Sequence, residues 1–193
     1  AGIPIPASML ASNAVQVKRI ASEIGYPVLL KAQTLETGRG KAGGVRLVQS
    51  EGDIENVTNE VFRLVFDAQP VQSILVEKAF TFSKEYYLGI RTDLDQGCPV
   101  LRVSEAGGAT FLEPESFLNA RIVEQPVDIN RGLKAFEIRN LLTNVDIDPS
   151  LWKQFISIAL KLYNIYRQKD ASLTEVNSLV VTHQQQLFAL DAK

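Results

Sequence analysis

The stretch from Lys31 to Val45, KAQTLETGRGKAGGV, restricts the possible folds of this chain more than any other. It holds four glycines and three cations, and apolar segments flank it at residues 27–30 and 45–48. Glycine lets backbone N–H groups approach a ligand closely, and nearby cations favour a polyanion. The stretch therefore predicts a phosphate-binding loop between two strands.

Three known phosphate-binding patterns compete for this loop. The P-loop pattern G-x-x-x-x-G-K-[ST] fails, because Ala42 stands where Ser or Thr is required. Gly38, Gly40 and Gly43 match the dinucleotide pattern G-x-G-x-x-G, but that pattern must open a helix, and the alternating residues after it indicate a strand. A strand–loop–strand flap over ATP phosphates fits best, although the protein-kinase motifs H-R-D and D-F-G are absent. The remaining alternative is a glycine-rich surface hairpin.

Charge and metal-ligand content exclude several classes of function. The net charge of −2 and the pI near 5.5 favour neither nucleic acid nor an anionic membrane as partner. One cysteine, Cys98, and one histidine, His183, argue against a zinc or iron–sulfur site, so any metal would be bound by oxygen. No apolar run has membrane length. We expect a cytoplasmic protein, and the start at Ala1 without methionine suggests a piece of a longer one.

Periodicity alternates between helix and strand along the chain, which predicts an α+β fold. Ser12 or Asn13 caps a helix that ends before Gly25, and Asp148-Pro149 is typical of a helix start. Further helices are expected after Asp53 and over 135–142, and strands over 73–80, 84–92, 99–104, 121–123, 175–181 and 187–193.

The last strand pair carries a candidate metal site. If the hairpin is symmetric about Gln184, Asn177 lies directly opposite Asp191, and Glu175 is two residues away on the same face. Carboxylate and amide oxygens are the ligands that Mg²⁺ takes when phosphates supply the others. The alternative is a set of polar residues at a frayed strand end. Similarly, Glu85 can accept bonds from ribose hydroxyls or form a surface salt bridge.

Several blocks together resemble the ATP-grasp domain of succinyl-CoA synthetase (succinate–CoA ligase, ADP-forming) β subunits. These blocks are Lys31–Val45, Leu75–Glu77, Lys84–Gly89, Lys169–Leu173, Glu175–Asn177 and Leu190–Lys193. The resemblance implies an ATP-grasp fold, in which two α+β subdomains, 1–80 and 81–193, hold ATP and Mg²⁺ in a nucleotide cleft.

The resemblance also implies roles for individual residues, by matching position. It implies no catalytic residue in this chain. The implied ligands are Lys31 and Arg39 for the phosphates, Gly38 and Gly40 in the loop over them, Glu77 and Phe80 for adenine, Glu85 for ribose, and Asn177 and Asp191 for Mg²⁺.

The implied activity is that of a ligase of the tricarboxylic acid cycle, which converts succinate, CoA and ATP to succinyl-CoA, ADP and phosphate. A partner α subunit would carry the phosphohistidine and the CoA site, so this chain alone would bind nucleotide without completing the reaction. Leu35–Gly38 and Ser178 depart from the usual His-Ala-Gly-Gly and proline, and Glu36 adds a negative charge near the phosphates. The alternatives are a non-catalytic ATP-grasp interaction module and a related malate– or citrate–CoA ligase.

Overall fold

The computed structural model describes residues 2–34, 40, 42–107 and 121–193. It divides into two compact units, a smaller one of Pro6–Phe80 and a larger one of Ala1–Ile5 with Thr81–Lys193. Residues 2–5 belong with the larger unit, whereas the sequence analysis placed them in the first subdomain. The N–H of Ala189 donates a hydrogen bond of 2.9 Å to the carbonyl of Pro4, which joins this segment to the larger unit.

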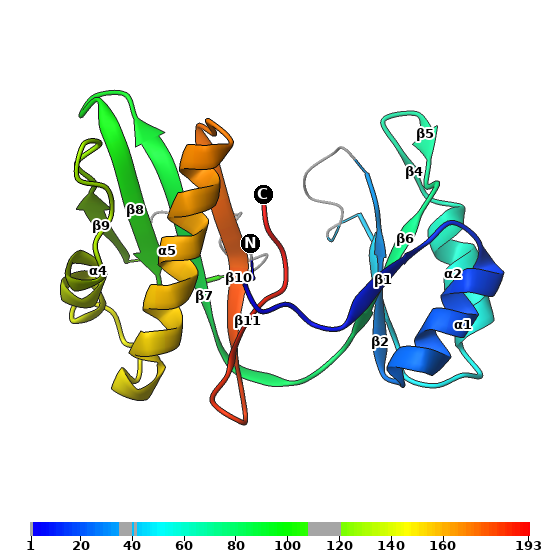
Figure 1. Ribbon diagram of the computed structural model, residues 1–193. Helices are drawn as coiled ribbons and strands as arrows, with labels where there is room; N and C mark the ends of the chain where they lie inside the picture. The colour runs from blue at the N-terminus through cyan, green and yellow to red at the C-terminus, as the bar shows by residue number, and fades with distance from the viewer. Residues whose placement is uncertain (1, 35–39, 41, 108–120) are drawn as a thin grey trace. The chain divides into compact units, whose positions relative to one another are not determined.

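The smaller unit is an antiparallel four-stranded sheet in the order β1-β6-β2-β3, with both of its helices on one face (Figure 1). Its strands are β1 (Ser8–Ala11), β2 (Val28–Ala32), β3 (Val45–Val48) and β6 (Ile74–Lys78), its helices are α1 (Ala14–Ile24) and α2 (Ile54–Phe62), and a short hairpin pairs β4 (Val65–Phe66) with β5 (Gln69–Pro70).

Helix α1 forms where its capping residues and apolar stripe predict it. The Asn13 side chain accepts a hydrogen bond of 2.9 Å from the N–H of Gln16, which satisfies a donor that the first turn leaves unpaired. Val17 and Ile20 are buried against the sheet. Gly25, with φ of 80°, ends the helix through its N–H to the carbonyl of Ala21.

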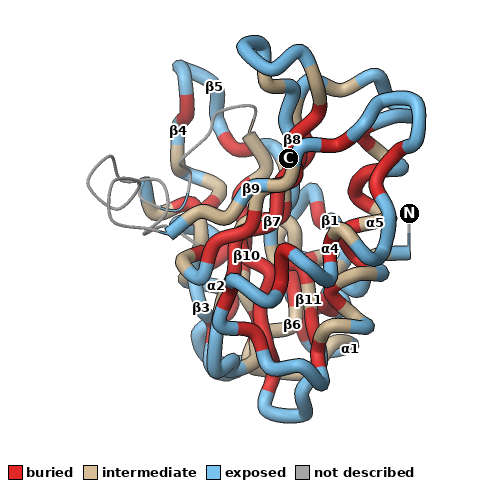
Figure 2. Tube along the Cα trace, turned by 90° about the vertical axis from the view of Figure 1, so that its left-hand side faces the viewer, coloured by how far each residue is buried: buried red, intermediate tan, exposed pale blue. Residues whose placement is uncertain are grey.

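The larger unit is an antiparallel five-stranded sheet in the order β11-β10-β7-β8-β9, with its helices against one face. Strands β2 and β6 of the smaller unit and β8 and β10 of the larger unit are largely buried, whereas most turns are exposed (Figure 2). The elements of the larger unit are β7 (Phe82–Asp93), β8 (Cys98–Ser104), β9 (Ile122–Pro126), α4 (Ala135–Leu142), the 3₁₀ turn η2 (Pro149–Leu151), α5 (Trp152–Gln168), β10 (Leu173–Thr182) and β11 (Leu187–Ala189).

Helix α5 covers the sheet with the aromatic stripe expected of it. The Asp148 carboxylate accepts a bond of 2.8 Å from the N–H of Ser150, but the chain first makes η2 and becomes α-helical only at Trp152. Phe155 packs edge-on against Tyr86 of β7, with ring centroids 6.4 Å apart. Across the described part of the chain, no helix combines the length and the hydrophobicity that a membrane span requires.

Candidate functional site

The glycine-rich loop joins two antiparallel strands of the smaller unit. Lys31 at the end of β2 pairs with Val45 at the start of β3, and the N–H of Ala32 donates to the carbonyl of Gly44 at 2.7 Å. The predicted strand–loop–strand arrangement is therefore confirmed, and the dinucleotide alternative is wrong, because a strand follows Gly43 where that pattern needs a helix.

Only part of the predicted phosphate loop belongs to the described residues. Gly38 and Arg39 lie outside them. Gly40 is exposed in a turn, and its carbonyl accepts the N–H of Gly43 at 3.2 Å. Gly43 adopts φ of 78°, a conformation that side chains other than glycine rarely take.

Two of the predicted nucleotide ligands form a buried ion pair. The Nζ of Lys31 lies 2.7 Å from Oε1 of Glu77, and their side chains are only 9% and 5% exposed. Because Lys31 is opposite Leu75 and Glu77 is opposite Leu29 in the β2–β6 ladder, both charges project from the sheet face that carries no helix of this unit. Separate roles were predicted for these two residues, and the pair was not predicted. The available signal was a lysine after the apolar residues of β2 and a glutamate after the apolar residues of β6.

Phe80 lies just after β6 and is half-buried. Lys78, between Glu77 and Phe80, points elsewhere, because its Nζ donates to the carbonyls of Gly25 and Tyr26 at 2.8 and 2.9 Å. These bonds hold the end of β6 against the turn after α1. The backbone that leads to Phe80 is thus anchored within the smaller unit.

In the larger unit, the hairpin of β10 and β11 has the predicted register. Leu179 pairs with Ala189 and Val176 with Ala192, so the pairing is symmetric about Gln184. The N–H of Asn177 donates to the carbonyl of Asp191 at 3.0 Å, which places these two residues opposite each other. Asn177 is half-buried and Asp191 is exposed. An amide side chain on β10 and a carboxylate in the segment after β11 therefore occupy facing positions.

A β-bulge shifts β10 against β7 at this position. Val176 pairs with Leu88 and Leu179 pairs with Tyr86, so Asn177 and Ser178 together oppose one residue, Tyr87. Val176 and Leu179 are both in the core although three positions separate them, which breaks the alternation of a regular strand. The bulge was not predicted, because it appears only when the two strands are paired.

Glu85 of β7 accepts a hydrogen bond from the second residue of the bulge, Ser178. It pairs with Val180 in the ladder, and the Oγ of Ser178 donates to Oε2 of Glu85 at 2.7 Å. Glu85 is half-buried and Ser178 is buried. In the sequence, Ser178 stands out only as a departure from the related pattern, and this contact was not predicted.

The other carboxylate of the predicted cluster, Glu175, is engaged by a tyrosine. The hydroxyl of Tyr87 donates to Oε2 of Glu175 at 3.0 Å. Burial, followed by the charge of Glu175 and this hydrogen bond, raises the pKa of Tyr87, so the hydroxyl keeps its proton and remains a donor. Among the described residues, no group of three or more His, Cys, Asp or Glu side chains is placed to hold a metal ion.

Gly89 makes room for the Tyr87 ring. A Cβ built on Gly89 would lie 2.8 Å from Cζ of that ring and still closer to its hydroxyl oxygen. We expect Gly89→Ala to lower the free energy of unfolding by about 1–3 kcal/mol, because the ring must leave its place beside Glu175. Urea unfolding followed by circular dichroism, which reports on both units, measures the loss.

Gly52→Ala is the matched control for this substitution. Its added Cβ would meet nothing closer than the Oγ of Ser50 at 3.8 Å, and its backbone has no positive φ. We expect it to change stability by less than about 0.5 kcal/mol. Equal effects of the two substitutions would show that the ring does not need the space above Gly89.

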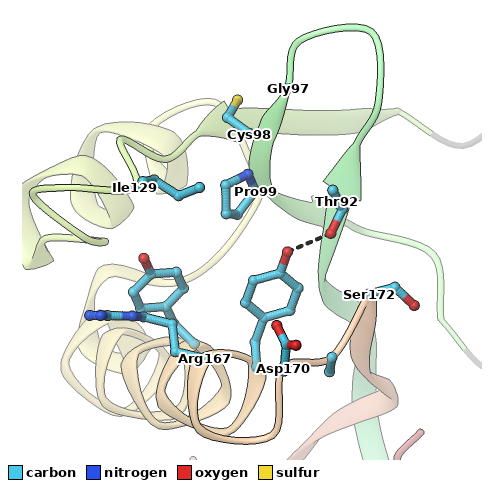
Figure 3. A pocket seen from close by; sticks show the side chains of 11 residues that line it. Thr92, Gly97, Cys98, Pro99, Ile129, Arg167, Asp170 and Ser172 are labelled. Carbon is cyan, nitrogen blue, oxygen red and sulfur yellow. Dashed lines mark hydrogen bonds between the residues drawn. The ribbon is translucent and has the colours of Figure 1, made fainter.

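The remaining features lie away from the predicted ligands. His183 is exposed in the turn between β10 and β11. A cavity of about 430 Å³ in the larger unit has Cys98, Arg167 and Asp170 in its wall, and a bond of 2.6 Å joins Thr92 and Tyr166 beside it (Figure 3). None of the predicted site residues lines this cavity.

Several curated proteins similar to this chain carry the same name. The chain is 39% identical to the succinate–CoA ligase [ADP-forming] subunit beta of Aquifex aeolicus over 199 residues, which cover 100% of this chain and 51% of that protein. It is 36% identical to the protein of the same name from Natronomonas pharaonis, with 100% and 50% covered. The chain thus spans about half the length of the curated relatives it matches.

Solved structures agree in fold at low sequence identity. PH1788 from Pyrococcus horikoshii superposes with a TM-score of 0.79 at 19% identity, covering 99% of this chain and 83% of that one. A dinucleotide-forming acetyl-coenzyme A synthetase of Ca. Korarchaeum cryptofilum, solved with coenzyme A and Ca-AMPCP, has a TM-score of 0.76 at 18% identity, covering 99% and 85%.

The predicted ATP-grasp fold is supported independently by a family model. The model for the ATP-grasp domain matches residues 1–181, which is nearly the whole chain, and the α+β architecture agrees with it. The chain therefore belongs to the ATP-grasp domain family.

Proposed function

We propose that this chain is the ATP- and Mg²⁺-binding part of an acid–CoA ligase, which couples cleavage of ATP to formation of an acyl-CoA thioester. The observation that carries the proposal is a set of three side chains in an ATP-grasp domain: Glu85 on β7, Asn177 on the adjacent strand β10, and Asp191 opposite Asn177 in the segment after β11. The shared name of the curated relatives supports succinate as the acid, with succinyl-CoA, ADP and phosphate as products.

Asn177 and Asp191 would hold the Mg²⁺ ion. Their amide and carboxylate oxygens are hard ligands, and the absence of a larger His, Cys, Asp and Glu cluster among the described residues fits a cation that takes most of its ligands from phosphates and water. The N–H of Ala192 donates to Oδ1 of Asp191 at 3.1 Å, which restrains the carboxylate. When bound, Mg²⁺ would neutralise phosphate charge.

The other nucleotide contacts would come from β2, β6, β7 and the glycine-rich loop. In the smaller unit, Lys31 would bind phosphate together with Gly38, Arg39 and Gly40, while Glu77 and Phe80 would contact adenine. Pairing with Glu77 supports this role of Lys31, because the pair holds the ammonium group on the helix-free face of the sheet. In the larger unit, Glu85 would accept hydrogen bonds from the ribose.

A partner subunit is needed for the complete reaction. The chain has a single histidine, His183, which is exposed in the turn that follows β10 and is not one of the predicted ligands. We propose that an α subunit supplies a phosphohistidine and the CoA site, and that the assembled ligase works in the cytoplasm. This chain alone would bind the nucleotide and release it unchanged.

Calorimetric titration with ATP, with and without Mg²⁺, tests the proposal. We expect saturable binding that strengthens at least about tenfold when Mg²⁺ is present, because the cation offsets the repulsion between phosphates and the Asp191 carboxylate. Binding that is equally strong with excess chelator would contradict the Mg²⁺ assignment. Absence of any nucleotide binding would favour the non-catalytic ATP-grasp module.

A further inference from the structure

Ser178 leaves the regular path of β10 and points to a neighbouring strand. The bulge between Val176 and Leu179 places two consecutive polar residues where a regular strand has one outward-facing position. As a result, Ser178 does not face the core as strict alternation after Val176 would require. Its hydroxyl instead reaches Glu85, which is 93 residues away in the sequence.

The contact between these side chains is short and sheltered. The Oγ–Oε2 distance of 2.7 Å is typical of a strong O–H···O bond, and Ser178 is 7% exposed. Among the described residues, Ser178 is the only side-chain partner of the Glu85 carboxylate. One carboxylate oxygen is therefore anchored, and Oε1 keeps its capacity to accept hydrogen bonds.

A carboxylate that is held in one position, like that of Glu85, is well placed to accept hydrogen bonds from two neighbouring hydroxyl groups. The ribose of a nucleotide presents two neighbouring hydroxyl donors, and a carboxylate oxygen accepts such bonds best when its side chain already occupies the required rotamer. Without Ser178, the Glu85 side chain would have to lose rotamer freedom each time a nucleotide bound. Because the hydrogen bond from the serine hydroxyl exists before binding, Glu85 has already lost this rotamer freedom in the nucleotide-free chain.

The geometry points to Ser178 as a positioning residue that holds Glu85 for the ribose hydroxyls and so sets the preference for ribose over sugars that lack them. This inference rests on the proposed function, because it requires nucleotide binding in the first place. It goes further in assigning a role to a residue whose side chain contacts Glu85 rather than the nucleotide. It also gives a function to the serine hydroxyl at this position of the bulge.

The test compares ATP with 2′,3′-dideoxy-ATP on the same purified chain, each with Mg²⁺. We expect the wild-type chain to bind ATP at least about tenfold more tightly than the dideoxy nucleotide, since a bond to a charged group is lost. In Ser178→Ala, the Kd for ATP should rise about three- to tenfold while the Kd for dideoxy-ATP stays within about twofold. Ser178→Thr keeps the hydroxyl and should retain the preference.

Unchanged affinity for dideoxy-ATP also shows that Ser178→Ala is folded, since a general loss of structure would weaken both nucleotides. Glu85→Gln serves as the reference, and it should lose the preference as far as Ser178→Ala or further. The double variant should be no worse than Glu85→Gln alone, because the serine acts through the carboxylate.

Three results would overturn the inference, and they differ in what they say of the proposed function. If Glu85→Gln loses the preference but Ser178→Ala keeps it, the serine does not position Glu85, and the proposed function stands. If the wild type binds both nucleotides equally, ATP binding stands but Glu85 does not contact ribose. If no nucleotide binds at all, the proposed function and the inference both fail.

Discussion

Replacing Lys31 by methionine is expected to lower the free energy of unfolding by about 3–5 kcal/mol. The Glu77 carboxylate, whose side chain is 5% exposed, would lose the ammonium group that now lies 2.7 Å away. Removing one member of a buried ion pair is costly, because the attraction that offset part of the desolvation of the remaining charge is lost. The loss should appear without nucleotide, which separates it from any effect on phosphate binding.

Urea unfolding followed by circular dichroism is the appropriate measurement. The single tryptophan, Trp152, lies in the larger unit, so its fluorescence would not report on the smaller one. Lys18→Met is the matched control, since it breaks an exposed pair with Glu51 at 3.7 Å and should cost less than about 1 kcal/mol. The double variant Lys31→Met/Glu77→Leu should recover most of the loss, because an apolar pair needs no compensation. If Lys31→Met were as mild as Lys18→Met, the buried pair would not be an element of stability.

Replacing Asp191 by alanine is expected to abolish the stabilisation that Mg²⁺ and ATP together give. At a ligand concentration a hundred times the Kd, binding to the folded state contributes about 2.7 kcal/mol, which raises the melting temperature of a chain of this size by about 5–10 °C. Without the carboxylate, only Asn177 would remain of the two protein ligands, and the Mg²⁺-dependent part of the shift should disappear. The stability of the nucleotide-free chain should change little, since Asp191 is exposed.

Thermal shift with ATP, in Mg²⁺ and in excess chelator, measures this effect. Asp95→Ala removes an exposed carboxylate from the turn between β7 and β8 and should keep the full shift. Asn177→Ala should reproduce the loss in part, because an amide oxygen is a weaker ligand than a carboxylate. A full Mg²⁺-dependent shift in Asp191→Ala would remove this residue from the proposed metal site while leaving nucleotide binding in place.

Local sequence patterns predicted much of this molecule because they act over a few residues. The cap at Asn13, the apolar stripe of α1 and the glycine after it determine a helix by themselves. The strands on either side of the glycine-rich loop follow from their alternation. The register of β10 with β11 follows from a short turn centred on Gln184, because a tight hairpin leaves few ways to pair its strands.

Local patterns did not predict the features that depend on pairing with a strand far away in the sequence. The bulge at Asn177 and Ser178 exists only relative to β7, and strand β1 at Ser8–Ala11 was missed because it forms only by pairing with β6. Both come from segments far along the chain, and periodicity within one segment carries no information on the register with another.

The sequence by itself thus determined the strand–loop–strand arrangement and the opposition of Asn177 and Asp191, and its resemblance to a known family implied the ATP-grasp fold. Only the tertiary structure decided that Lys31 pairs with Glu77 and that Ser178 holds Glu85. The physical reason is that each of these contacts joins side chains on different strands, and a shift of one residue in either ladder would send them to opposite faces of the sheet.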